Sequence, residues 1–147
     1  MALAEVLFVG NLLVVGFLTG VIWFVQIVHY PLFAQITPAG FGTYHTRHSD
    51  LTTRVVALPM VVDFGLSGLL IVIRPEWFSA GGSLAGFALA LLTWLCTFLV
   101  SVPLHGRLGQ GHDRAVIARL VATNWLRTAT WTAHLLLLAF ILLRALP

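Results

Sequence analysis

The chain has 147 residues, of which 59% are apolar and 9% are charged, and its mean hydropathy is +0.98. A disordered chain is poor in apolar residues, and a soluble domain carries about 25% charged residues, so this composition excludes the first class and argues against the second. All eight basic residues are arginines that flank apolar runs, and they form no basic stripe of the kind that binds nucleic acid. We therefore expect an integral membrane protein that contacts the lipid bilayer and no nucleic acid.

The apolar residues fall into four runs, each close to the length of about 20 residues that a helix needs to cross the hydrocarbon core. In lipid the backbone polar groups must be paired within each segment, so each run is expected to be a helix. The sequence predicts an all-α fold, an integral membrane four-helix bundle that forms one domain over residues 1–147. The expected spans are residues 6–28, 55–73, 83–104 and 125–145. The first run lacks the basic residues and cleavage site of a signal peptide, so we expect it to be retained.

The arginines predict an orientation. Six of them lie in or beside the connections that follow the first and third spans, and two lie on the other side. Because basic residues concentrate in cytoplasmic loops, we expect an inner (plasma) membrane protein with both termini on the non-cytoplasmic side. On the cytoplasmic side, Thr37 before Pro38 and Asp113 mark expected helix starts. On the other side, Ser83 is the expected N-cap of the third helix.

A weak internal repeat relates the two halves of the chain. Residues 28–32, Val-His-Tyr-Pro-Leu, align with residues 100–104, Val-Ser-Val-Pro-Leu, at an offset of 72. Arg54 aligns with Arg127 at an offset of 73. This pattern predicts two parallel two-helix repeats related by an axis along the membrane normal.

Polar residues share one face of each helix on a helical wheel, which indicates four stripes that converge in the bundle interior. His48 and Asp63 are 15 residues apart, a rise of about 22 Å, so the stripes hold two separate sites. The first lies at the cytoplasmic end and comprises Gln26, His29, His45, His48, His105, Asn124 and Arg127. The second lies near the midplane and comprises Asp63 and His134. Arg54 departs from the pattern, because the wheel places it opposite His45 and His48; either the helix is distorted there, or Arg54 pairs with Asp50.

The histidine cluster has three interpretations. His29, His45, His48 and His105 carry imidazoles that suit iron, copper or zinc, so they are candidate metal ligands. His29 and His105 are the one pair at suitable heights to ligate a heme from opposite sides. The third interpretation is that the imidazoles only form hydrogen bonds at the helix ends.

The remaining candidates concern proton transfer and substrate binding. Asp63 and His134 form either a proton relay or general acid/base pair, or an interhelical hydrogen bond. Arg127 with Asn124 either holds an anionic or quinone-like oxygen or marks the membrane edge. Gln26 and Trp131 are the expected contacts to a bound cofactor or flat substrate.

Two segments carry a resemblance to a known family. Residues 102–108, Val-Pro-Leu-His-Gly-Arg-Leu, and residues 124–128, Asn-Trp-Leu-Arg-Thr, resemble motifs of the small four-helix membrane proteins that include the fungal anthrone oxygenases. The family shows V-P-L-N-x-x-L followed by W-x-x-x-N-H-x-R-T, so His105, Trp125 and Leu120 depart from its usual Asn, His and Trp. The resemblance implies a four-helix bundle, oxygen-dependent oxidation of flat phenolic compounds, and His105, Asn124 and Arg127 as site residues.

Three functional hypotheses follow. The first is a membrane oxidoreductase or oxygenase that acts on a small hydrophobic or aromatic substrate at the histidine-lined end, with iron, copper or heme as its candidate cofactor. The second is a small proton-coupled transporter that uses Asp63 and His134. The third is an accessory or assembly subunit without chemistry. Glycines on the first two helices offer surfaces for a homo-oligomer, and these are Gly10, Gly16, Gly20, Gly65 and Gly68.

Overall fold

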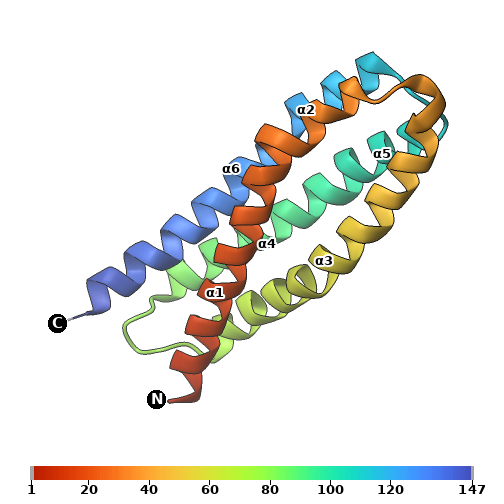
Figure 1. The fold of residues 1–147 in the computed structure, drawn as a ribbon. Helices are drawn as coiled ribbons and strands as arrows, with labels where there is room; N and C mark the ends of the chain where they lie inside the picture. Colours follow the sequence, from red (N-terminus) through yellow and green to blue (C-terminus); the bar gives the residue numbers. More distant parts are fainter. Residues whose placement is uncertain (1, 147) are drawn as a thin grey trace.

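The computed structural model describes residues 2–146, which form four long helical rods joined by short connections (Figure 1). The first rod is built from four consecutive helical elements. These are α1 (Leu3–Phe24), the π-helical segment η1 (Val25–His29), α2 (Tyr30–Leu32) and the 3₁₀ segment η2 (Phe33–Gln35). The second rod is the single helix α3 (Pro38–Val72).

The second half of the chain repeats this design. The third rod consists of α4 (Ala80–Cys96), the π-helical segment η3 (Thr97–Ser101) and α5 (Val102–Leu108). The fourth rod is the single helix α6 (Arg114–Ala145). Helix α1 packs against α3 and α6, and α4 packs against the same two helices, so the rods form a closed antiparallel bundle. The all-α four-helix prediction is therefore confirmed.

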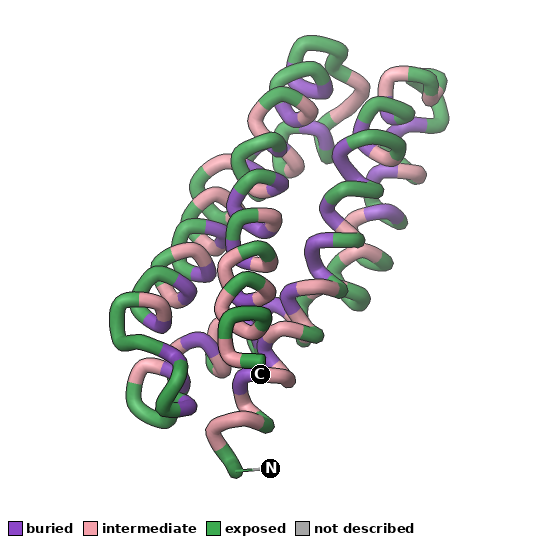
Figure 2. The backbone as a smooth tube through the Cα atoms, turned by 90° about the vertical axis from the view of Figure 1, so that its left-hand side faces the viewer, coloured by how far each residue is buried: buried purple, intermediate pink, exposed green. Residues whose placement is uncertain are grey.

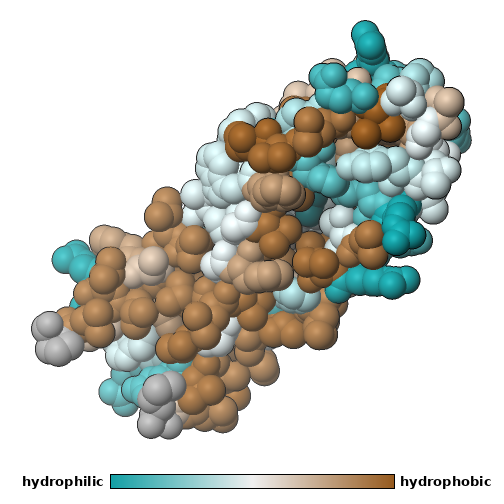
Figure 3. Space-filling view, viewed as in Figure 1, coloured by the Kyte–Doolittle hydropathy of each residue, from teal (hydrophilic) through white to brown (hydrophobic). Residues whose placement is uncertain are grey.

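The two ends of the bundle differ. Both termini and the connection between α3 and α4 lie at one end, which we call the termini end (Figure 1). Elements α2 and α5 and the starts of α3 and α6 lie at the other, which we call the histidine end. Hydrophilic residues gather at the histidine end, and the middle of the bundle presents mainly hydrophobic residues (Figure 3).

All four rods are long and apolar enough to cross a membrane. They contain 33, 35, 29 and 32 residues, so each exceeds the roughly 30 Å of the hydrocarbon core at about 1.5 Å per residue. Outward side chains on the rods are large and apolar: Leu13, Leu58 and Leu99 are 68, 70 and 71% exposed. Buried positions instead follow the inner faces of the rods (Figure 2). Such a surface is compatible with an integral membrane protein, as the composition predicts.

The helix starts agree with the sequence at two positions and differ at one. Thr37 precedes Pro38 at the start of α3, and the Asp113 carboxylate accepts hydrogen bonds from the amides of Ala115 and Val116 at the start of α6. The N-cap of α4 is Ser79, whose Oγ accepts a hydrogen bond from the Gly82 amide at 3.1 Å. The prediction of Ser83 is wrong because α4 begins one turn earlier, and the Ser83 hydroxyl donates to the carbonyl of Ala80.

The two π-helical segments lie 72 residues apart, at the offset of the predicted repeat. In each segment the amide that closes the wide turn bonds five residues back, Tyr30 to Val25 and Val102 to Thr97. The next residue is a proline, Pro31 or Pro103, which has no amide proton to continue the α-helical pattern. The wide turn absorbs one extra residue, which rotates everything beyond it by about 100° relative to a continuous α-helix.

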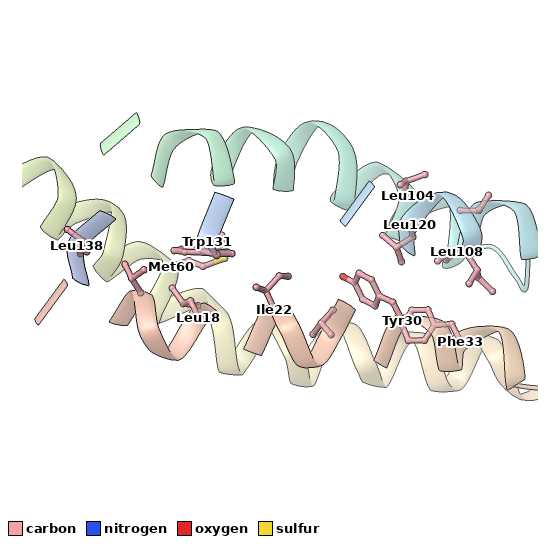
Figure 4. Packing of buried hydrophobic residues seen from close by; sticks show 14 of the residues in the cluster. Leu18, Ile22, Tyr30, Phe33, Met60, Leu104, Leu108, Leu120, Trp131 and Leu138 are labelled. Carbon is pink, nitrogen blue, oxygen red and sulfur yellow. The ribbon is translucent and has the colours of Figure 1, made fainter. Parts of the chain in front are cut away.

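The apolar core runs the length of the bundle. Leu18, Met60 and Trp131 meet in its middle, with Ile22 and then Tyr30 and Phe33 following toward the histidine end (Figure 4). Two of the glycines proposed for oligomer contacts lie close to side chains of neighbouring helices, and the oligomer contacts stay a prediction. A Cβ on Gly10 would meet Leu66 at 3.7 Å, and one on Gly16 would meet Leu135 at 3.8 Å.

Candidate functional site

The four histidines predicted as one group do come together at the histidine end. His29 Nε2 lies 2.6 Å from His48 Nδ1, and His45 Nε2 lies 3.0 Å from His105 Nδ1. The rings of His48 and His105 stack with their centroids 5.6 Å apart, which joins the two pairs. The residues come from η1, α3 and α5, so three of the four rods build this cluster. We call these four residues the histidine cluster.

Phe33 supports the cluster from inside the bundle. Its ring is fully buried and meets the His48 ring edge-on, with centroids 4.9 Å apart. It also contacts His45 and His105 in the same edge-on manner. An apolar ring in this position fixes the imidazoles without using their nitrogens, so the nitrogens remain available for one another and for a ligand.

Tyr30 is a further member of the site that the sequence analysis did not select. Its hydroxyl lies 2.9 Å from His105 Nε2, and its side chain is buried. On a continuous α-helix Tyr30 would lie about 40° from Gln26 and about 100° from Asn11. The π-helical turn before Tyr30 absorbs one residue and brings the tyrosine into phase with Asn11.

A buried amide network holds Arg127 beside the cluster. The Asn124 amide donates to Gln26 Oε1 at 2.9 Å, and Thr128 donates to the same oxygen at 3.4 Å. Arg127 Nη1 in turn donates to Asn124 Oδ1 at 3.3 Å. Gln26 and Asn124 are thus occupied with interhelical hydrogen bonds, and their effect is to fix Arg127 in place.

A cavity of about 420 Å³ opens between α3 and the η3–α5 segment. This volume lies in the range of about 300–1,000 Å³ that is typical of small-molecule sites. Its polar lining combines three members of the histidine cluster with the tyrosine and the arginine: Tyr30, His45, His48, Ser49, Thr52, Thr53, Thr97, Ser101, His105 and Arg127. Val56 and Val102 add apolar lining, and exposed Thr53 and Val102 place its mouth between the second and third rods.

Arg127 carries the main electrostatic feature of this cavity. Within residues 2–146 its guanidinium has no carboxylate partner, because the one ion-pair contact is that between His134 and Asp63. Its Nε is buried and has no hydrogen-bond partner in the described chain. A partly buried cation with a free donor favours a ligand that brings an oxygen with negative charge.

His48 is the cluster member best placed to exchange a proton. Its Nδ1 contacts both His29 Nε2 and the Thr52 hydroxyl, the latter at 3.1 Å. Its Nε2 has no hydrogen-bond partner among the described residues. With the Nδ1 proton donated to His29, Nε2 carries the lone pair and can act as a base, and His29 sets the orientation of the ring. His29 also lines a second cavity of about 380 Å³ with Tyr44 and Arg47.

The cluster is built as two imidazole pairs. Within residues 2–146, no group of three or more His, Cys, Asp or Glu side chains is arranged to hold one metal ion. The pairwise nitrogen contacts explain this, because the nitrogens of each pair face each other and do not converge on one shared point. His29 and His105, the candidate heme ligands, do not face each other either, because His29 contacts His48 and His105 contacts His45. Iron, copper and heme at these residues stay predictions.

Asp63 and His134 lie together in a second region, as the helical wheels predicted. His134 Nδ1 is 3.9 Å from Asp63 Oδ1, and both side chains are buried. The Asn11 amide donates to the same carboxylate oxygen at 2.8 Å, a partner that the sequence analysis did not assign. Asp63 Oδ2 and both His134 ring nitrogens have no hydrogen-bond partner within residues 2–146. None of the cavities described here is lined by Asp63 or His134.

Two other predicted residues take structural positions. Trp131 is 2% exposed and sits in the core against Leu18 and Met60, where it borders a small cavity next to Arg127. Arg54 is exposed, so it does not face the interior beside Arg127 as the repeat alignment suggested. The phase of an uninterrupted α3 explains this, because Pro59 causes no break in the helix.

Comparison with protein-family models, with curated proteins and with solved structures finds no match to this chain. The resemblance to the anthrone oxygenase group therefore stays a prediction.

Proposed function

We propose that this membrane bundle is an oxidoreductase that oxidises a small, flat, weakly acidic aromatic compound in the cavity at the histidine end. The observation that carries the proposal is the Arg127 guanidinium, which has no carboxylate partner within residues 2–146, in a cavity that Tyr30 and three histidines of the cluster also line. A cation without a counterion selects an oxyanion, and a phenolate or enolate of a lipophilic compound supplies one. The mouth between the second and third rods gives such a compound access at the edge of the bilayer.

Each residue then has a role. Arg127 binds the substrate oxygen and stabilises its negative charge, and Asn124 positions Arg127. His48 removes a proton from the carbon to be oxidised, and His29 orients His48. His105 and Tyr30 form a hydrogen-bonded pair that contacts the same cavity and orients the substrate.

The proposed reaction follows the resemblance and balances without a further reductant. A methylene group next to an aromatic ketone is converted to a second carbonyl by molecular oxygen. One oxygen atom enters the carbonyl and the other leaves as water with the two hydrogens. The carbon loses four electrons and the oxygen molecule gains four. The acid–base work falls to the imidazoles, and removal of the first proton gives the resonance-stabilised anion that Arg127 holds.

The test uses the protein in nanodiscs with anthrone as the substrate. Oxygen uptake and formation of the quinone are followed together, and the metal content of the same sample is measured. We expect quinone formation that depends on the protein and is lost in Arg127→Gln, with Arg54→Gln as the control on an exposed arginine. Protein that folds and leaves anthrone unchanged contradicts the proposal. Stoichiometric iron or copper that is lost in His45→Ala/His48→Ala would assign the cluster to metal instead.

A proton-coupled carrier is the second candidate, favoured by the buried polar atoms of Asp63 and His134 that have no hydrogen-bond partner in the described part of the chain. The carboxyl group of Asp63 and the imidazole of His134 can share a proton and release it in the hydrocarbon region. The carrier predicts that Asp63→Asn abolishes proton flux in proteoliposomes. Unchanged proton flux in Asp63→Asn would contradict the carrier hypothesis. Both proposals place the protein in the inner (plasma) membrane with the histidine end in the cytoplasm.

A further inference from the structure

A second, much smaller cavity adjoins the histidine-lined one inside the bundle. It has a volume of about 30 Å³ and lies between α1, α3 and α6. Four residues line both cavities: Tyr30, Thr52, Val56 and Arg127. The small cavity therefore reaches the same arginine and tyrosine as the large one, but from the side of the first rod.

The lining of the small cavity differs sharply from that of its neighbour. Every residue that it does not share with the large cavity is apolar: Leu18, Val21, Ile22, Val25, Met60 and Trp131. Figure 4 places Ile22 between the group around Trp131 and the ring of Tyr30. Val21 is the half-buried residue of this set, so it stands where the cavity meets the outer surface. Val21 and Val56 lie within the expected spans, so that surface faces the hydrocarbon of the bilayer.

Size and polarity together restrict what can use this cavity. One water-sized molecule needs about 10–15 Å³ of such space, so a volume of about 30 Å³ admits one or two very small molecules and no aromatic ring. The part of the cavity lined by Leu18, Ile22 and Met60 gives a water molecule few hydrogen-bond partners, and small apolar species such as xenon occupy apolar space of this kind. Water is instead expected at the part lined by Tyr30, Thr52 and Arg127. Molecular oxygen is apolar, has the right size and dissolves better in hydrocarbon than in water.

We infer that this cavity is the entry site for molecular oxygen, which passes from the bilayer between α1 and α3 to a substrate held at Arg127. The inference rests on the proposed oxidation and names the route of its co-substrate. The aromatic substrate and the oxygen then reach the reacting carbon from different sides. Oxygen supplies one atom to the new carbonyl and one to water, as in the balanced reaction above.

The experiment blocks the mouth of the small cavity and leaves the large one intact. Val21→Phe fills the mouth, and Val14→Phe is the matched control because Val14 is also half-buried on α1 but lines a groove on the outside of the bundle. The rate of anthrone oxidation is measured in nanodiscs as a function of oxygen concentration. Xenon binding, followed by NMR of dissolved xenon, reports on the cavity without any turnover.

We expect Val21→Phe to raise the KM for oxygen severalfold, to leave the KM for anthrone and kcat at saturating oxygen unchanged, and to lose xenon binding. Val14→Phe should behave like the unaltered protein in all these measurements. An unchanged KM for oxygen in a folded Val21→Phe protein overturns the inference, whether or not xenon still binds. Failure of the unaltered protein to oxidise anthrone overturns the proposed function and this route with it, so the two failures are distinguishable.

Discussion

The bundle contains two polar regions that both include buried histidines and that differ in access. At the histidine end, imidazoles, a tyrosine and an arginine line a cavity of about 420 Å³. In the other region, Asp63 and His134 are enclosed by helix packing, and a Cβ on Gly86 would lie 3.3 Å from His134 Nε2. The buried polar residues thus line a cavity at the histidine end and make contacts between helices in the other region.

The charges of the two regions also differ. Asp63 Oδ1 accepts hydrogen bonds from Asn11 and Ser67 and has His134 nearby, whereas its Oδ2 has no partner within residues 2–146. Arg127 has one neutral partner, Asn124, and its Nε is left without one in the described chain. The Asp63 region thus contains a carboxylate with protein donors and an imidazole nearby, whereas the Arg127 region contains a cation without a carboxylate partner in the described chain.

The largest expected effect is on the rate of oxidation, and it distinguishes His48 from His134. His48→Gln should lower the oxidation rate by about 10²–10⁴-fold, the usual contribution of a general base. His134→Gln is the matched change in the other region, and it should leave the rate per folded molecule within about twofold, a difference of less than 0.5 kcal/mol. Equal losses in both variants would contradict the division of roles.

The second prediction concerns the charge at the histidine end. Arg127→Gln should reduce oxidation by about 10²–10³-fold, because it removes a donor from the developing negative charge. Isothermal titration with a hydroxyanthraquinone product analogue should show weaker binding in the same variant. Arg54→Gln, on the exposed face of α3, should change neither quantity. Undiminished binding of the hydroxyanthraquinone to Arg127→Gln would show that the arginine does not bind the ligand.

The third prediction concerns stability in the enclosed region. Asp63→Ala should lower the free energy of unfolding by about 1–3 kcal/mol, since the buried Asn11 amide loses its acceptor. The double variant Asn11→Leu/Asp63→Leu should recover part of this loss, because both partners become apolar. Unfolding by a denaturing detergent measures both changes, with Asp50→Ala on the surface as the control. Full stability in Asp63→Ala would show that the hydrogen bond contributes nothing.

The smallest expected effect is at Tyr30. Tyr30→Phe keeps the ring and removes the hydroxyl that contacts His105, so it should cost about 1 kcal/mol, or about fivefold in rate. Tyr44→Phe is the control, because Tyr44 lines the other cavity beside His29. A comparison of initial rates at saturating anthrone checks both. A larger loss of rate in Tyr44→Phe than in Tyr30→Phe would indicate that the reaction takes place in the cavity beside His29.

The sequence predicts the helices and the two polar groups because both depend on repeating local patterns. Apolar runs of span length must form helices in lipid. The helical wheel of α3 places His45, His48 and Asp63 on one face, and the wheel of α6 places His134 on the face that converges on it. Tyr30 and the Asn11 hydrogen bond were not predicted. A wheel at 100° per residue places Tyr30 about 40° from Gln26, so the wheel did not exclude it, and the π-helical turn at Val25–His29 sets its final orientation. The valine–proline pattern repeated 72 residues later was the signal for this turn.

The central claim is that ligand chemistry belongs to the histidine end and not to the enclosed pair. The most direct measurement is the nitrogen-15 NMR spectrum of histidine-labelled protein in nanodiscs during titration with a hydroxyanthraquinone. The account predicts that the signals of His45, His48 and His105 shift with ligand and that the signal of His134 stays in place. A spectrum in which His134 shifts and the cluster does not would contradict it.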